Sequence, residues 1–174
     1  MSRPAATALP IASAVLRTLI VLNWIYGAIV LVILIWMFVA APATLTALGF
    51  PPSAQSGLSL MGLRAIAALG LVAVPLNLAV LKRLVAMVQT VRTGDPFVAA
   101  NATRLQAIAW FLLGQQVLSL IIGLIGKSIS MAGQPLHLNA GFSPSGWLAV
   151  ILTFVLARVF LEGTQMREDL EGTV

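Results

Sequence analysis

The sequence has no cysteine, a single histidine and few charged residues. Asp, Glu, Lys and Arg make up 9% of the 174 positions, and only five of these residues are acidic. Without cysteine, the chain has no disulfide, no thiolate nucleophile and no cysteine-bound metal. His137 by itself cannot supply a metal site. Because a soluble globular domain carries about 25% charged residues, the composition also excludes that class.

What the chain has in abundance is apolar sequence. Hydrophobic residues make up 60% of it, and the mean hydropathy is +1.03. A helix of about 20 apolar residues spans the hydrocarbon core of a bilayer. Four runs are long enough, at residues 15–40, 58–81, 105–126 and 145–162. The sequence predicts an all-α, polytopic membrane protein with four transmembrane helices, forming a single domain over residues 1–174.

The basic residues indicate which side of the membrane each loop faces. Arg64 and Lys127 lie apart from the rest. The other eight lie near the termini or between the second and third runs: Arg3, Arg17, Lys82, Arg83, Arg92, Arg104, Arg158 and Arg167. Short loops rich in Lys and Arg stay in the cytoplasm. We therefore predict cytoplasmic termini, a cytoplasmic elbow at residues 82–104, and outer loops at residues 41–57 and 127–144.

The elbow contains the signals that end one helix and start the next. Gly94 is favourable just after the end of a helix, Asp95 is favourable as an N-cap, and Pro96 is favourable at the first helical position. The second and third helices are therefore expected to extend into the cytoplasm, with the third starting near Pro96. Pro75 removes the backbone hydrogen bond to the carbonyl of Leu71, which predicts a kink in the second span.

Local signals elsewhere predict three further boundaries. Residues 1–10 are short, small and proline-bearing, and are expected to form a frayed tail. A short surface helix is expected around residues 44–48 of the first outer loop. Ser143 and Pro144 repeat the pairing of an N-cap with a first helical position, so the fourth helix is expected to open at about Ser145.

Arg64 lies about six residues inside the second run, a rise of about 9 Å along a helix. A charge within a span marks a functional site by default, and every acid of the chain lies toward the opposite side. Arg64 either binds an anionic ligand or a lipid phosphate, or extends its aliphatic stem to the headgroups. We favour the second interpretation.

Polar amides within the spans allow two interpretations. Asn23, Asn77 and Gln116 lie on faces that also carry small residues, and Gln115 is the neighbour of Gln116. They either line a polar pocket that binds a ligand or hydrogen-bond neighbouring helices, at about 0.6 kcal/mol per bond. We favour helix packing.

The positions of the acids argue against chemistry inside the membrane. Asp95, Glu162, Glu168, Asp169 and Glu171 all lie near or beyond the inner ends of the apolar runs. Proton and cation relays use carboxylates or histidines at mid-membrane depth. The spans contain no paired aspartates and no H-E-x-x-H motif, and the chain has no GxGxxG or P-loop sequence. The sequence therefore predicts a protein that is not an enzyme and has no cofactor or metal.

The C-terminal tail also has two interpretations. Met166, Leu170 and Val174 recur every four residues, next to Glu168, Asp169 and Glu171. An amphipathic segment of this kind either docks a cytoplasmic partner or forms a solvated helix end.

Two motifs resemble those of a known family. Gly94-Asp95-Pro96-Phe97, Asn101 and Arg104-Leu105 match a G-x-P-F…N…R-L pattern. Near the end, the chain resembles the closing pattern L-A-x-x-F-x-x-G…E…T-V/I through Leu156, Ala157, Phe160, Gly163, Glu168, Thr173 and Val174. Both patterns are those of the bacterial membrane proteins called the domain of unknown function 2975 family. Arg158 departs from the family, in which an acidic residue is expected at that position.

The resemblance implies a four-helix protein of the bacterial cytoplasmic membrane, whose relatives are often encoded beside a small helix-turn-helix regulator. It thus implies a non-enzymatic membrane partner of a transcription factor, with no direct binding to nucleic acid. Candidate docking residues are Asp95, Pro96, Phe97, Asn101, Arg104, Glu162, Glu168, Asp169 and Leu170. The alternative is a small oligomeric transporter or immunity-type protein that uses Arg64 and the interior amides. Besides the lipid bilayer, a second copy of the chain remains a possible partner.

Overall fold

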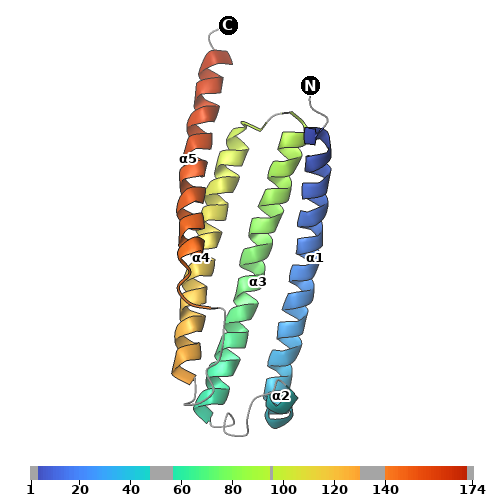
Figure 1. The fold of residues 1–174 in the computed structure, drawn as a ribbon, viewed down its shortest axis with the longest axis vertical. Helices are drawn as coiled ribbons and strands as arrows, with labels where there is room; N and C mark the ends of the chain where they lie inside the picture. Colours follow the sequence, from blue (N-terminus) through green and yellow to red (C-terminus); the bar gives the residue numbers. More distant parts are fainter. Residues whose placement is uncertain (1–3, 48–56, 95, 130–139, 172–174) are drawn as a thin grey trace. The chain divides into compact units, whose positions relative to one another are not determined.

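The computed structural model describes residues 4–47, 57–94, 96–129 and 140–171. All the regular elements in these residues are helices: α1 (Pro4–Val39), α2 (Ala41–Ala47), α3 (Gly57–Arg92), α4 (Ala99–Ile129) and α5 (Pro144–Glu171) (Figure 1). Four helices in this part of the chain, all except α2, are long and apolar enough to cross a membrane. The predicted all-α class with four helices of spanning length is confirmed.

The chain divides into two compact units. The first contains Met1–Leu22, Leu76–Gly114 and Pro144–Val174, and the second contains Asn23–Pro75 and Gln115–Ser143. The boundaries fall inside α1, α3 and α4, so each of these helices contributes to both units, whereas α5 belongs to the first unit alone.

The first unit has a thin apolar core. Its buried residues come from three helices: Val80 and Leu81 of α3; Ala102, Leu105, Ile108 and Ala109 of α4; and Val150 and Ala157 of α5. The Trp110 and Phe154 rings pack edge to face with centroids 5.3 Å apart, and the Arg83 guanidinium lies 4.6 Å from the Phe111 ring centroid. Large apolar residues such as Ile151 and Leu152 are more than half exposed, as lipid-facing residues are expected to be.

The second unit is held by close helix contacts. Met37 and Leu63 are buried against Ile33, Leu60 and Ile129. A Cβ on Gly27 would lie 3.1 Å from a methyl group of Val74, so the missing side chain permits α1 and α3 to approach each other there. Small residues serve this purpose in membranes, because burial of apolar surface does not drive helices together in lipid.

The elbow differs from the prediction at one end and agrees with it at the other. After Arg92 the chain turns at Gly94, which has a φ of 87° and donates its N–H to the carbonyl of Val91. The expected glycine end of the helix is confirmed. The prediction that the next helix opens near Pro96 is wrong, since α4 begins at Ala99. The side-chain amide of Asn101 donates a hydrogen bond to the Pro96 carbonyl. In a helix that started at Pro96, this carbonyl would have accepted a hydrogen bond from a main-chain N–H instead. Asp95 lies outside the described residues.

Of the other predicted helix boundaries, some are confirmed and one is wrong. The frayed tail predicted for residues 1–10 is wrong at residues 4–10, because α1 begins at Pro4 and contains Pro10; residues 1–3 lie outside the described residues. Pro4 suits the first helical position, and the three alanines that follow before Pro10 are the strongest helix formers. The short helix expected around residues 44–48 is present as α2, three residues earlier. The fourth spanning helix opens at Pro144, next to its predicted start.

Candidate functional site at the elbow

Asn101 is the centre of a hydrogen-bond network that fixes the elbow. Its side chain is 1% exposed, and its Nδ2 donates to Thr90 Oγ1 at 2.7 Å and to the Pro96 carbonyl at 2.9 Å. Arg104 Nη1 donates to Asn101 Oδ1 at 2.8 Å. One buried amide therefore ties together the end of α3, the turn and the first turns of α4, with both of its polar atoms used.

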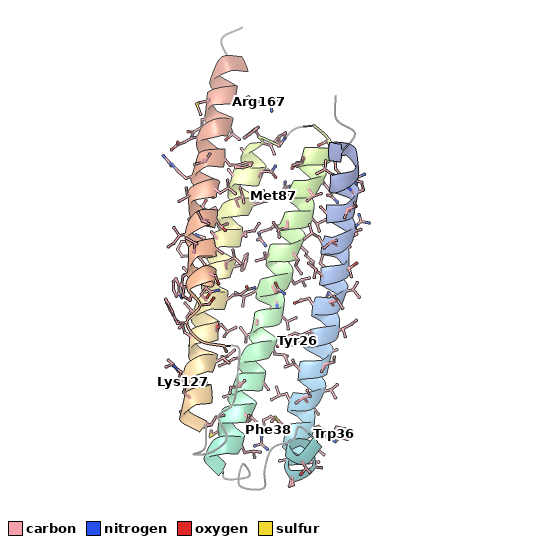
Figure 2. All side chains as sticks on the ribbon, viewed as in Figure 1. Tyr26, Trp36, Phe38, Met87, Lys127 and Arg167 are labelled. Atoms are coloured by element: carbon pink, nitrogen blue, oxygen red, sulfur yellow. The ribbon has the colours of Figure 1, made fainter. Side chains whose placement is uncertain are left out.

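The far partner in this network is itself held in place. Thr90 Oγ1 donates to the carbonyl of Met87, 2.7 Å away, which leaves its lone pairs for Asn101. Met87 is labelled on α3 in Figure 2. Hydrogen bonds therefore run from Arg104 through Asn101 and Thr90 to Met87 and join α4 to the end of α3.

Phe97 joins the elbow to α5. Its ring stacks on that of Phe160 with centroids 5.4 Å apart and an angle of 28° between the planes. One turn further along α5, a Cβ on Gly163 would lie 3.7 Å from the Phe97 ring. Phe97 nevertheless remains 48% exposed. An aromatic residue that is both fixed and half exposed is the kind of anchor around which protein interfaces form.

Beyond Gly163, α5 carries the acidic end of the chain. Thr164 is buried and donates its hydroxyl to the Leu161 carbonyl. The helix continues to Glu171 and so includes Glu168, Asp169 and Leu170, whose side chains lie outside the described residues. Glu162 accepts a hydrogen bond from Arg158 Nε at 2.7 Å, as their spacing of one helical turn permits.

The structure thus separates the candidate docking residues by role. Phe97 presents a surface, Asn101 is buried and holds the turn, and Arg104 is half-buried and bound to Asn101. Pro96 contributes its carbonyl to the same network. Sequence reasoning missed Thr90 and the stacking role of Phe160. Phe160 belongs to the closing family pattern and could have been found there, whereas Thr90 belongs to neither family motif.

Arg64 has partners that the sequence did not identify. Its Nη2 donates to the carbonyl of Met37 at 2.7 Å, and its guanidinium lies 4.3 Å from the centroid of the Phe38 ring, labelled near the end of α1 in Figure 2. Met37 is in the last turn of α1, where carbonyls lack helical donors and the helix dipole favours a cation. Arg64 therefore caps α1. Its Nε is buried without a hydrogen-bond partner among the described residues.

The interior amides have different environments. Asn23 is buried and its Nδ2 donates to the Val74 carbonyl at 3.1 Å, which supports a packing role next to Pro75. Gln116 has a buried Oε1 without a hydrogen-bond partner in the described part of the chain. Gln115 is half-buried and Asn77 is exposed. A polar pocket shared by these four residues stays a prediction.

The described residues include no group of three or more His, Asp or Glu side chains that could hold a metal ion. The elbow presents the half-exposed Phe97 ring beside the hydrogen-bond network centred on Asn101.

The family profile described as "Protein of unknown function (DUF2975)" matches residues 65–174, which include the elbow and all of α5. The chain belongs to this family. Membership predicted from the two motifs is confirmed, and the DUF2975 match contains every residue of the elbow network and of the Phe97–Phe160 contact. Arg64 and α1 precede it. No curated protein and no solved structure matches the chain.

Proposed function

We propose that this DUF2975 protein is a non-enzymatic protein of the bacterial cytoplasmic membrane that docks a small helix-turn-helix transcription factor at its elbow. The observation that carries the proposal is Phe97, half exposed yet fixed against Phe160 and next to Gly163. Such a residue contributes binding energy without a large loss of side-chain freedom when a partner covers it.

The charge distribution supports a cytoplasmic elbow. Within the first unit, the start of α1, the elbow and the last turns of α5 lie at the same end (Figure 1). Arg92, Arg104 and Arg167 belong to these segments. Because basic segments next to spanning helices stay inside, this end is the cytoplasmic one in our proposal, and it is where a transcription factor would meet the protein.

The end of α5 suits a DNA-binding partner in particular. Glu168, Asp169 and Glu171 give the helix end three carboxylates within one turn. A protein that binds DNA carries a positive surface for phosphates, and a run of acidic residues on the helix that also supplies Phe160 is complementary to such a surface. Binding here would compete with DNA and hold the regulator at the membrane. The family resemblance provides the choice of a helix-turn-helix regulator.

The test is membrane capture of the helix-turn-helix protein encoded beside the gene of this chain. The full chain and the regulator are expressed together, and the fraction of regulator that sediments with membranes is measured. We expect the triple change Glu168→Gln, Asp169→Asn and Glu171→Gln to release most of the regulator, because the complementary charge is lost. Phe97→Leu should weaken capture as well, since it keeps an apolar side chain but loses the stacked ring.

Lys127→Gln at the other end of α4 serves as the control and should leave capture unchanged. Capture that persists in both the triple variant and Phe97→Leu would refute the docking surface, as would the absence of such a regulator beside the gene.

The alternative of a transporter or immunity-type protein used Arg64 together with the interior amides. That side chain caps α1 and lies over Phe38, so its charge has a structural explanation, and no observation favours this alternative.

A further inference from the structure

A groove between α4 and α5 in the first unit lies where both helices change from polar to apolar sequence. Its volume is about 240 Å³. The lining residues are Ala102, Thr103 and Gln106 of α4 and Phe154, Ala157, Arg158 and Leu161 of α5. Polar and charged side chains (Thr103, Gln106 and Arg158) and apolar ones (Phe154, Ala157 and Leu161) both line it. Arg158 is the first charged residue of α5 after an uncharged run from Pro144 to Ala157, so the groove lies at the level at which lipid headgroups meet acyl chains.

Arg158, which lines the groove, forms an oriented pair of opposite charges with Glu162, one turn further along α5. Arg158 Nε donates to Glu162 Oε1 at 2.7 Å, while the two side chains are 70% and 53% exposed. This single bond uses one guanidinium nitrogen and one carboxylate oxygen. The two terminal nitrogens of Arg158 and the second oxygen of Glu162 have no hydrogen-bond partner among the described residues.

The geometry points to a binding site for one phospholipid with a zwitterionic ethanolamine headgroup, that is, phosphatidylethanolamine. The terminal nitrogens of Arg158 would donate to the phosphate, as a guanidinium does well because of its planar fork. Gln106, exposed on the facing helix, adds amide donors to the same oxygens. The acyl chains would follow Phe154 and Ala157 into the membrane.

Glu162 determines the choice among headgroups. The primary ammonium of ethanolamine carries three N–H donors and can bind the second carboxylate oxygen, whereas the quaternary ammonium of choline has no N–H to donate. An anionic glycerol headgroup would meet the Arg158–Glu162 pair, whose net charge is zero, and would be repelled by Glu162. The site therefore favours phosphatidylethanolamine over both phosphatidylcholine and phosphatidylglycerol. This binding is separate from the docking of a transcription factor.

Native mass spectrometry of the full chain in detergent tests the site. The protein is mixed with equimolar phosphatidylethanolamine, phosphatidylcholine and phosphatidylglycerol of identical acyl chains, and the adducts of each lipid are counted. We expect about tenfold more phosphatidylethanolamine than phosphatidylcholine, the ratio for one charge-assisted hydrogen bond. Equal retention of these two lipids by the native chain would overturn the proposal.

Variants separate the two halves of the headgroup. Glu162→Gln should abolish the preference for ethanolamine over choline while phosphate binding remains, and Arg158→Gln should lower retention of all three lipids. The exchange of the pair, Arg158→Glu with Glu162→Arg, keeps an ion pair for folding but places the cation one turn away from Gln106. It should lose the preference too. A preference that survives either Glu162→Gln or the exchanged pair shows that the groove does not select the headgroup.

Discussion

Replacement of Asn101 by alanine removes the residue on which the elbow geometry depends. The change deletes three hydrogen bonds, to Thr90, to Pro96 and from the Arg104 guanidinium. A neutral hydrogen bond contributes about 0.5–1.5 kcal/mol and one to a charged group about 1.5–3 kcal/mol. Because Pro96 and Arg104 are only half-buried, water will replace part of the loss, and we expect a net cost of about 3 kcal/mol.

This cost should fall on the elbow rather than on the spans. Local opening of the turn would become about 100-fold more frequent, since each 1.4 kcal/mol changes an equilibrium constant tenfold. Hydrogen exchange of the Gly94 and Asn101 amides reports that opening, because they donate to the carbonyls of Val91 and Val98, on either side of the turn. Thermal unfolding in detergent measures whether the effect spreads.

Two further variants make the experiment quantitative. Thr103→Ala, two residues further along α4, removes an exposed hydroxyl that bonds only within the helix, and it should cost less than about 0.5 kcal/mol. Thr90→Val removes one partner of Asn101 and should cost about 1 kcal/mol. In a double-mutant cycle the two changes at Thr90 and Asn101 should be clearly non-additive. If Asn101→Ala accelerated exchange at the elbow no more than Thr103→Ala does, the network would not hold the turn.

Three other predictions concern the rest of the chain. Arg64→Gln should lower stability in detergent by about 2 kcal/mol, because the bond to the Met37 carbonyl is charge-assisted; unchanged thermal unfolding would contradict the capping role. Gly123→Ala should destabilise more than Gly114→Ala, since the new Cβ meets backbone at 2.7 Å in the first case and a flexible leucine methyl at 2.9 Å in the second; equal unfolding temperatures would show that the close approach is unimportant. A reporter fused after Val174 should be active only in the cytoplasm, and periplasmic activity would refute the predicted orientation.

Much of the fold followed from local sequence because a bilayer restricts the choices. Within hydrocarbon every backbone N–H and C=O group must be paired inside the segment, so a run of about 20 apolar residues becomes a helix. The end of α3 at Gly94 is equally local, since the glycine takes a positive φ there. The start of α4 could not be predicted from local signals. Pro96 is a favourable first helical residue, but its carbonyl accepts a hydrogen bond from the side chain of Asn101, five residues further along the chain, and α4 begins only at Ala99.

The candidate site was only partly visible in the sequence. The family motif contained Phe97 and Asn101, but it did not distinguish the exposed anchor from the buried brace. Burial depends on what packs against a residue, and here α5, far along the chain, supplies Phe160 and Gly163. The groove next to Arg158 has the same origin, because it forms only where α4 and α5 lie together.

Arg64 shows most clearly what each level decides. The sequence alone determined that this charge lies near one end of an apolar span with no acid nearby, and composition determined that the protein belongs in a membrane. Only the tertiary structure placed the Met37 carbonyl 2.7 Å from its guanidinium. Every residue carries a main-chain carbonyl, so the sequence does not show which carbonyl will lack a helical donor at a helix end. Nor does it show which of these carbonyls another helix will approach.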